Sequence, residues 1–217
     1  MKLYAKFGLP LLLLALAILL ASCGGEMQGM DHGKKDGSGG MSGMGEMKGT
    51  VHGPGGMASG MLMKNGKYSD ERFIDAMVPH HEGAVDMARV ALKYAEHPEI
   101  EQLAENIIST QKAEIQDLKS IKQEEFGTSR VPMNMSIGQM KSMGMMNPGD
   151  LAKKDPFDKA FIDAMIPHHQ SAIEMAGVAL KETDNPKIKE LAANIVEAQK
   201  HEISQMKQWR KQWYQEG

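Results

Sequence analysis

Cysteine is almost absent from this chain, because Cys23 is the only one among its 217 residues. Without a second cysteine there is no intramolecular disulfide and no thiolate cluster, so a metal site would have to use His, Met, Asp or Glu. No Glu-x-x-His segment occurs either, which argues against the di-iron and di-manganese carboxylate sites of helical bundles. A blue-copper centre needs a cysteine ligand, and none is available if Cys23 is lipidated.

Aromatic residues and excess charge are also scarce. Aromatic residues make up 5% of the chain, and the formal net charge is −3 with both signs mixed along the sequence. A core must therefore be built mainly from Ile, Leu, Ala, Val and Met. The sequence shows no basic surface, so nucleic acid is not an expected partner.

Only one long apolar run is present, at residues 9–20, and Lys2 and Lys6 precede it. Residues 20–24 read Leu-Ala-Ser-Cys-Gly, which is typical of a lipoprotein signal peptide. A transmembrane helix is the alternative, but spanning a membrane needs roughly 20 residues. We expect residues 1–22 to be a signal peptide and Cys23 to carry a lipid that anchors the protein in the cell envelope. This anchor would hold it on the periplasmic side, at the outer membrane if the host is Gram-negative.

Two segments are rich in methionine and glycine and poor in branched apolar residues. Residues 23–67, which also contain histidine, are expected to be a disordered tether behind the lipid anchor, and residues 127–157 a linker. Many of the 20 methionines of the chain lie in these two segments. Because a thioether in water gains nothing from packing, we expect these methionines to provide weak, exchangeable sites for a soft metal.

The rest of the chain contains the same unit twice. Residues 73–88 read FIDAMVPHHEGAVDMA and residues 161–176 read FIDAMIPHHQSAIEMA. The match continues at a constant offset of 88 residues, which indicates duplication of a whole structural unit. Apolar residues recur every three or four positions on both sides of a proline-containing turn, so each unit should form two long helices. We therefore expect an all-α protein in which helical hairpins at 68–126 and 158–217 form a four-helix bundle.

Side chains that bind metals lie on or beside the apolar stripe of the first helix in each unit. They are Met77, His80, His81 and Met87 in the first unit and Met165, His168, His169 and Met175 in the second. Glu114 and Glu202 lie within the stripes of the second helices, where a carboxylate requires a partner such as a histidine or its metal. His201 adds an imidazole beside Glu202 in the second unit only, so equal binding by the two units is not required.

A structural role accounts for part of this pattern. Methionine on a helix stripe usually fills the core, and a single inward histidine is usually structural. A His-His pair that is repeated together with an inward methionine and a facing glutamate favours a metal site. The residue types, thioether and imidazole, suit copper and especially Cu(I).

The string Phe-Ile-Asp-Ala-Met-Val/Ile-Pro-His-His, followed by Gln-Lys-x-Glu-Ile, resembles the domain of unknown function family 305. The characterised members of that family are copper-binding proteins of the CopM type. The resemblance covers about residues 70–125 and 158–213 and implies a ferritin-like bundle. It further implies an extracytoplasmic protein that binds copper, preferentially Cu(I), and supports copper resistance. The eight Met and His residues of the two units are the ligands that it implies, and Glu114 and Glu202 match its Gln-x-x-Glu-Ile element.

Three hypotheses for the function follow. The first is a lipid-anchored protein, not an enzyme, that captures and buffers Cu(I) or Ag(I) and passes it to an unidentified partner protein. An oxidising compartment agrees with the lack of thiols. The second is a metalloenzyme on a ferritin-like bundle. The third is a structural or adaptor lipoprotein in which the histidines belong to a polar network in the core.

Overall fold

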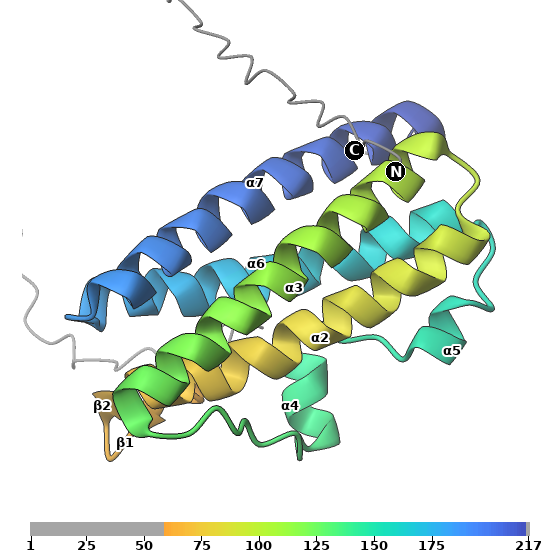
Figure 1. Ribbon diagram of the computed structural model, residues 1–217. Helices are drawn as coiled ribbons and strands as arrows, with labels where there is room; N and C mark the ends of the chain where they lie inside the picture. The colour runs from red at the N-terminus through yellow and green to blue at the C-terminus, as the bar shows by residue number, and fades with distance from the viewer. Residues whose placement is uncertain (1–58, 216–217) are drawn as a thin grey trace, which may run out of the picture. The chain divides into compact units, whose positions relative to one another are not determined.

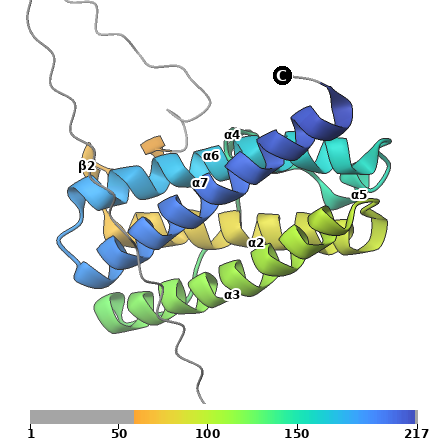
Figure 2. The same cartoon turned by 90° about the horizontal axis from the view of Figure 1, so that it is seen from above.

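Four long helices dominate the computed structural model, which describes residues 59–215 (Figures 1 and 2). They are α2 (Asp70–Tyr94), α3 (Pro98–Phe126), α6 (Phe157–Glu182) and α7 (Pro186–Tyr214). Helices α2 and α3 form one hairpin, α6 and α7 form the other, and the hairpins meet mainly between α2 and α6. The prediction of an all-α, ferritin-like four-helix bundle made of two duplicated hairpins is confirmed.

The predicted signal peptide, Cys23 and most of the predicted tether lie outside the described residues. Within residues 59–215, no helix has the length and apolar character needed to cross a membrane.

The helix ends follow from local sequence. Pro98 and Pro186 lie in the first turn of α3 and α7, where the N–H that proline lacks would have no helical partner. Helix α3 ends at Gly127, whose φ of 72° is the left-handed conformation that favours glycine. Between these ends, the two long helices of each hairpin pack against each other through their apolar stripes.

The start of α3 is capped from the other hairpin. The carboxylate of Asp158, in the first turn of α6, is fully buried and accepts hydrogen bonds from the backbone N–H groups of Glu96 and His97 at 3.1 and 2.8 Å. Its Oδ2 also lies 2.6 Å from Nδ1 of His97. The start of α7 is capped instead by its own Asn185. Asp158 therefore joins the two hairpins at this end of the bundle.

The segment before α2 is part of the fold. Strands β1 (Met63–Lys64) and β2 (Lys67–Tyr68) form an antiparallel hairpin around Asn65 and Gly66, whose φ values of 54° and 75° suit a tight Asn-Gly turn. Leu62 is fully buried. Residues 59–67, which the sequence assigned to the tether, therefore include a buried core residue and most of the β-hairpin.

The linker between the hairpins contains two short helices, α4 (Ile137–Ser142) and α5 (Pro148–Leu151). A capping box between Ser136 and Gln139 starts α4. The side chain of Met143 is fully buried, so the expectation that linker methionines have no packing role is wrong for this residue. In Figure 1, α4 and α5 lie below α2, on one side of the bundle.

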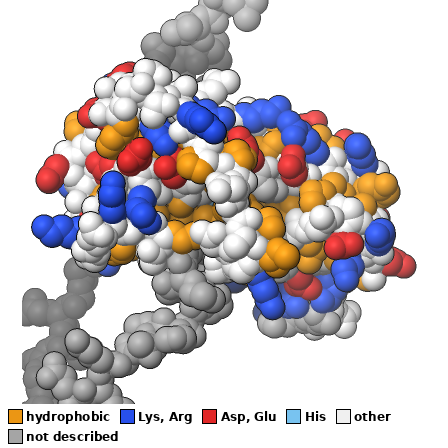
Figure 3. Space-filling view, turned by 90° about the horizontal axis from the view of Figure 1, so that it is seen from below, with side chains coloured by type: hydrophobic (Ala, Val, Ile, Leu, Met, Phe, Trp, Pro, Cys, Tyr) orange, Lys and Arg blue, Asp and Glu red, His pale blue; other side chains and the backbone are white. Residues whose placement is uncertain are grey.

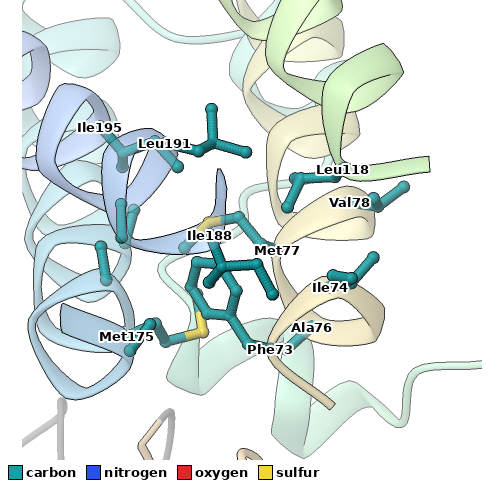
Figure 4. Packing of buried hydrophobic residues seen from close by; sticks show 14 of the residues in the cluster. Phe73, Ile74, Ala76, Met77, Val78, Leu118, Met175, Ile188, Leu191 and Ile195 are labelled. Atoms are coloured by element: carbon teal, nitrogen blue, oxygen red, sulfur yellow. The ribbon is translucent and has the colours of Figure 1, made fainter. Parts of the chain in front are cut away.

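Two apolar clusters make up the core. The first apolar cluster contains residues from both hairpins, including Phe73, Met77, Leu118, Met175 and Ile188 (Figure 4). The second apolar cluster includes Met87, Ile107, Phe161, Met165 and Met206. Residues near the start of α2 thus pack with the later part of α6, and the reverse holds in the second cluster, so α2 and α6 run antiparallel. The His-His segments lie between the two clusters.

Candidate metal centre

Four imidazoles meet where α2 crosses α6. His80, His81, His168 and His169 are all 0% exposed. The rings of His80 and His168 are the closest pair, with centroids 3.8 Å apart. We call these four histidines, with Glu114 and Glu202, the histidine layer. None of the described histidines is visible on the face shown in Figure 3.

The side chain of His80 is held by groups of the second hairpin. Its Nε2 lies 2.8 Å from Oγ of Ser171 and 3.1 Å from the carbonyl oxygen of His168. The hydroxyl of Ser171 lies 2.7 Å from that same carbonyl and 3.0 Å from the carbonyl of Met143, so its single proton points to a carbonyl. Carbonyl oxygens only accept hydrogen bonds, so Nε2 of His80 must carry the proton in this network. The lone pair of His80 is therefore on Nδ1.

His81 and His169 are each paired with a carboxylate of their own hairpin. Nε2 of His169 lies 2.6 Å from Oε2 of Glu202, and Nε2 of His81 lies 2.9 Å from Oε2 of Glu114. The second contact has an ion-pair distance without hydrogen-bond geometry. Because a carboxylate only accepts hydrogen bonds, Nε2 is the protonated nitrogen of His169, and the carboxylate beside Nε2 of His81 favours the same tautomer. This explains how two glutamates are tolerated on apolar stripes, as the sequence predicted.

The opposite ring nitrogens have no partner. Among the described residues, nothing forms a hydrogen bond with Nδ1 of His80, His81, His168 or His169, and Nε2 of His81 and of His168 also has none. An unpaired buried polar atom costs about 1–3 kcal/mol, so several together in one layer require an explanation. Metal-binding histidines commonly donate one ring N–H to a carboxylate or carbonyl and bind the metal through the other nitrogen. The arrangement of the layer fits that pattern.

The protonation states of His80 and His168 also favour metal binding. Burial holds the pKa of His80 and of His168 well below the ordinary histidine value, and the neighbouring imidazoles lower both further. Both rings are therefore neutral at neutral pH. A neutral imidazole can bind a metal without first losing a proton.

The four predicted methionines are fully buried and lie on both sides of the layer. Met77 and Met175 belong to the first apolar cluster, whereas Met87 and Met165 belong to the second. The grouping therefore crosses the repeats, because the antiparallel helices bring the early methionine of one hairpin to the late methionine of the other. Met77 still precedes His81 by one helical turn, as Met165 precedes His169.

His201 is not part of the layer. Its side chain is exposed on α7, whereas Glu202 beside it reaches His169. Adjacent residues on a helix point about 100° apart, so both cannot face the same interior position. The extra imidazole of the second unit therefore adds nothing to the buried group.

Gln111, Gln199 and Ser171 are among the buried polar residues that sequence reasoning missed. Gln111 on α3 and its repeat counterpart Gln199 on α7 are each 2% exposed, and their amide groups have no partner among the described residues. Both lie in the same heptad-like series as the neighbouring apolar residues and the glutamate, which was a readable signal. Ser171 carried no such signal, because its role depends on the contact between hairpins.

Within residues 59–215, no three side chains of the His, Cys, Asp or Glu type form a group that could hold a metal ion. A metal in the layer would therefore need donors of a different kind. Thioethers are the donors available next to the imidazoles. The donor set consequently suits a soft ion and does not suit Mg²⁺ or Ca²⁺, which take oxygen ligands.

Comparison with known proteins gives the family. The model of the family described as domain of unknown function (DUF305) matches residues 17–122 and residues 70–210, so the chain belongs to this family. A short stretch is also 43% identical over 49 residues to an uncharacterized protein, L153, of Acanthamoeba polyphaga mimivirus. That match covers 23% of this chain and 32% of the relative.

Solved structures of the protein CopM are similar to this chain. CopM in the Cu(II)-bound form is 43% identical with a TM-score of 0.64, and CopM in the Cu(I)-bound form is 41% identical with a TM-score of 0.61. Each match covers 68% of this chain and 99% of CopM. A DUF305 fragment from Deinococcus radiodurans is 25% identical with a TM-score of 0.58, over 64% of this chain and 92% of the fragment.

Proposed function

We propose that this chain is a copper-binding protein that holds Cu(I) in the histidine layer. The observation that carries the proposal is a group of four buried imidazoles in which Nδ1 is unpaired, while Nε2 of His80 and of His169 is hydrogen-bonded and Nε2 of His81 lies beside a carboxylate. The similarity to CopM, of which Cu(I)-, Cu(II)- and Ag-bound structures exist, supports the binding of copper. The activity is capture and buffering, and no catalytic step is part of it.

The histidines and methionines supply the ligands in this proposal. Nδ1 of a neutral imidazole and the sulfur of a methionine suit Cu(I) and Ag(I), which prefer soft and borderline donors. Thioether ligands carry no proton, and His80 and His168 are already neutral, so binding by these groups releases few protons. The buried position excludes water and slows exchange of the bound ion.

Glu114 and Glu202 have a supporting part and are not ligands in this proposal. Each carboxylate faces Nε2 of a histidine in its own hairpin. Such a partner orients the ring and raises the basicity of the free nitrogen. The sequence placed these glutamates among the candidate metal ligands. Their short distances to the Nε2 atoms favour a role as partners of the histidines and not as ligands of the metal.

The location and the wider role rest on the sequence. We assign the protein to the outer side of a cell membrane, anchored through a lipid on Cys23, where it contributes to copper resistance. Apart from Cys23, the chain has no thiol that an oxidising compartment would convert, which agrees with this assignment. An acceptor protein for the copper belongs to the same proposal.

The alternative is a purely structural polar layer, which the ion pairs of His81 and His169 favour. Anaerobic titration of the full-length protein with Cu(I), in competition with a chromophoric chelator, separates the two. We expect His80→Ala/His168→Ala to weaken the tight binding at least tenfold, while His201→Ala, an exposed control on the same bundle, leaves it unchanged. Far-UV circular dichroism checks that each variant stays helical. Unchanged binding by the folded double variant would mean that the layer is structural.

A further inference from the structure

A second group of sulfur atoms lies outside the core, between α2 and the linker. A surface pocket of about 420 Å³ is lined on one side by α2 and on the other by five linker methionines. These are Met133, Met135, Met140, Met145 and Met146. We call this the methionine pocket. The histidine layer does not include any of these side chains.

Burial does not account for Met133 and Met140, although Met135, Met145 and Met146 pack in part against the two apolar clusters. The side chain of Met133 is 55% exposed and that of Met140 is 36% exposed, whereas Met135, Met145 and Met146 are half-buried. Leucine would fill the same space with nearly the same volume and a smaller loss of side-chain entropy. What methionine adds at these positions is a polarisable sulfur that can bind a soft ion.

Gly83 adapts α2 to one of these methionines. A Cβ at this position would lie 3.0 Å from Cε and 3.5 Å from Sδ of Met145, so glycine is what lets the thioether lie against the helix. The equivalent residue of the second hairpin is Ser171, which binds the linker carbonyl of Met143. The pocket is thus specific to the first hairpin and does not arise from the duplication.

Charge in the pocket favours a soft ion over a hard one. Glu82 and Asp86 line the wall formed by α2, but Glu82 lies 3.5 Å from Lys119 and Asp86 lies 2.7 Å from Arg89. Lys141 lines the pocket as well. The carboxylates are therefore already paired with cationic groups, and a hard divalent cation would find no free oxygen cluster. The thioethers are the donors that remain.

We propose that the methionine pocket is a second binding site for Cu(I) and Ag(I), formed by thioether sulfurs of Met133, Met140 and Met145. The inference rests on the proposed function, because it extends soft-metal binding from the core to the surface. The linker also contacts the layer, since Met143 precedes Met145 by two residues and accepts a hydrogen bond from Ser171. The linker thus connects the methionine pocket to Ser171, which is a hydrogen-bond partner of His80.

The test uses full-length protein labelled with ¹³C in the methionine methyl groups and titrated with Ag(I), which is not redox-active. We expect the methyl signals of Met133, Met140 and Met145 to shift together, as assigned through single Met→Leu variants. The triple variant Met133→Leu/Met140→Leu/Met145→Leu should bind one Ag(I) fewer than the wild type. Ile137→Leu is the matched control, because Ile137 lines the same pocket and is exposed but carries no sulfur.

A second arm separates this inference from the proposed function. In His80→Ala/His168→Ala, the pocket methyl signals should still shift with Ag(I), because their ligands are intact. If pocket signals stay fixed and the triple variant binds as many ions as the wild type, the pocket is ordinary packing and the inference is overturned, whatever the histidines do. If the histidine variant binds like the wild type while the pocket signals shift, the pocket stands and the histidine layer fails.

Discussion

The two hairpins carry the same buried side chains but meet the linker differently. Pro79 and Gly83 of the first hairpin face the methionine pocket, whereas their counterparts Pro167 and Ser171 do not line it. Pro79 is buried and Pro167 is exposed. The duplication thus repeated the buried histidines and methionines at a fixed offset. The linker occurs once and makes different contacts with the two hairpins. The two histidine pairs are therefore alike in sequence, but the linker packs differently against the two hairpins that carry them.

The largest difference between equivalent positions is expected at Asp158 and Asp70. Asp158→Ala removes the acceptor for two backbone N–H groups and for His97, and we expect it to lower the free energy of unfolding by about 3 kcal/mol. Asp70→Ala, in the first turn of α2, should cost about 1 kcal/mol or less. Urea denaturation of the apo protein measures both. Equal losses in the free energy of unfolding for the two variants would show that the hydrogen bonds of Asp158 with Glu96 and His97 contribute little.

A second contrast compares Ser171→Ala with Gly83→Ala. Loss of the Ser171 hydroxyl removes the donor to the carbonyl of Met143 and leaves Nε2 of His80 with the His168 carbonyl alone, which should cost about 2 kcal/mol. At Gly83 the new methyl group meets the flexible end of Met145, and the gain in helix propensity of about 1 kcal/mol offsets the crowding, so little change is expected. The same denaturation experiment compares them. A larger loss at Gly83 would contradict this account of the linker contacts.

Glu114→Gln and Glu202→Gln should affect the two hairpins alike. Removing a carboxylate behind a metal-binding histidine typically weakens metal binding by about 10–100-fold, and we expect about tenfold for each variant. Competitive Cu(I) titration gives the affinities, and Glu197→Gln, an exposed glutamate on α7, is the control. An effect at only one of the two positions would show that the hairpins do not contribute equally to the site.

The smallest effect is a pH dependence of the apo protein. The pKa of His80 and of His168 is depressed in the folded state, so the unfolded chain binds more protons below about pH 6.5. The stability contribution of the neutral rings is therefore complete above pH 6.5 and declines as pH falls toward the folded pKa values. The other titratable groups of the layer are His81 and His169, with Glu114 and Glu202.

The variant His80→Gln/His168→Gln should flatten this decline. Thermal unfolding followed between pH 7 and pH 5 measures the slope for the wild type and for the variant. An equal slope in both proteins would assign the pH dependence to other groups.

Much of the fold could be read from the sequence because it depends on local and repeated signals. The constant offset identified the two hairpins, and apolar spacing placed all four His side chains of the layer on the inner face of α2 and α6. The β-hairpin and α4 were missed, although Asn65-Gly66 and the Ser136/Gln139 capping box were readable. Those signals are short and lie within segments whose composition suggests disorder.

The composition of the site could not be read so fully, because it depends on the contact between hairpins. A helical wheel treats one helix at a time, so it grouped Met77 with Met87 and could not show that Met77 shares a cluster with Met175. The roles of Ser171 and of the buried glutamines follow from the same contact. The wheel was sufficient, however, to pair Glu114 and Glu202 with imidazoles.

The central claim is that imidazole Nδ1 atoms of the histidine layer bind a soft metal. The most direct test is NMR of full-length protein labelled with ¹⁵N in the histidine rings, during titration with Ag(I). The account predicts that Nδ1 signals of the layer histidines shift while their Nε2–H groups stay protonated, and that the exposed ring of His201 is unaffected. If Ag(I) saturates the protein while the four layer rings keep their apo signals, the claim is contradicted and the metal is bound elsewhere.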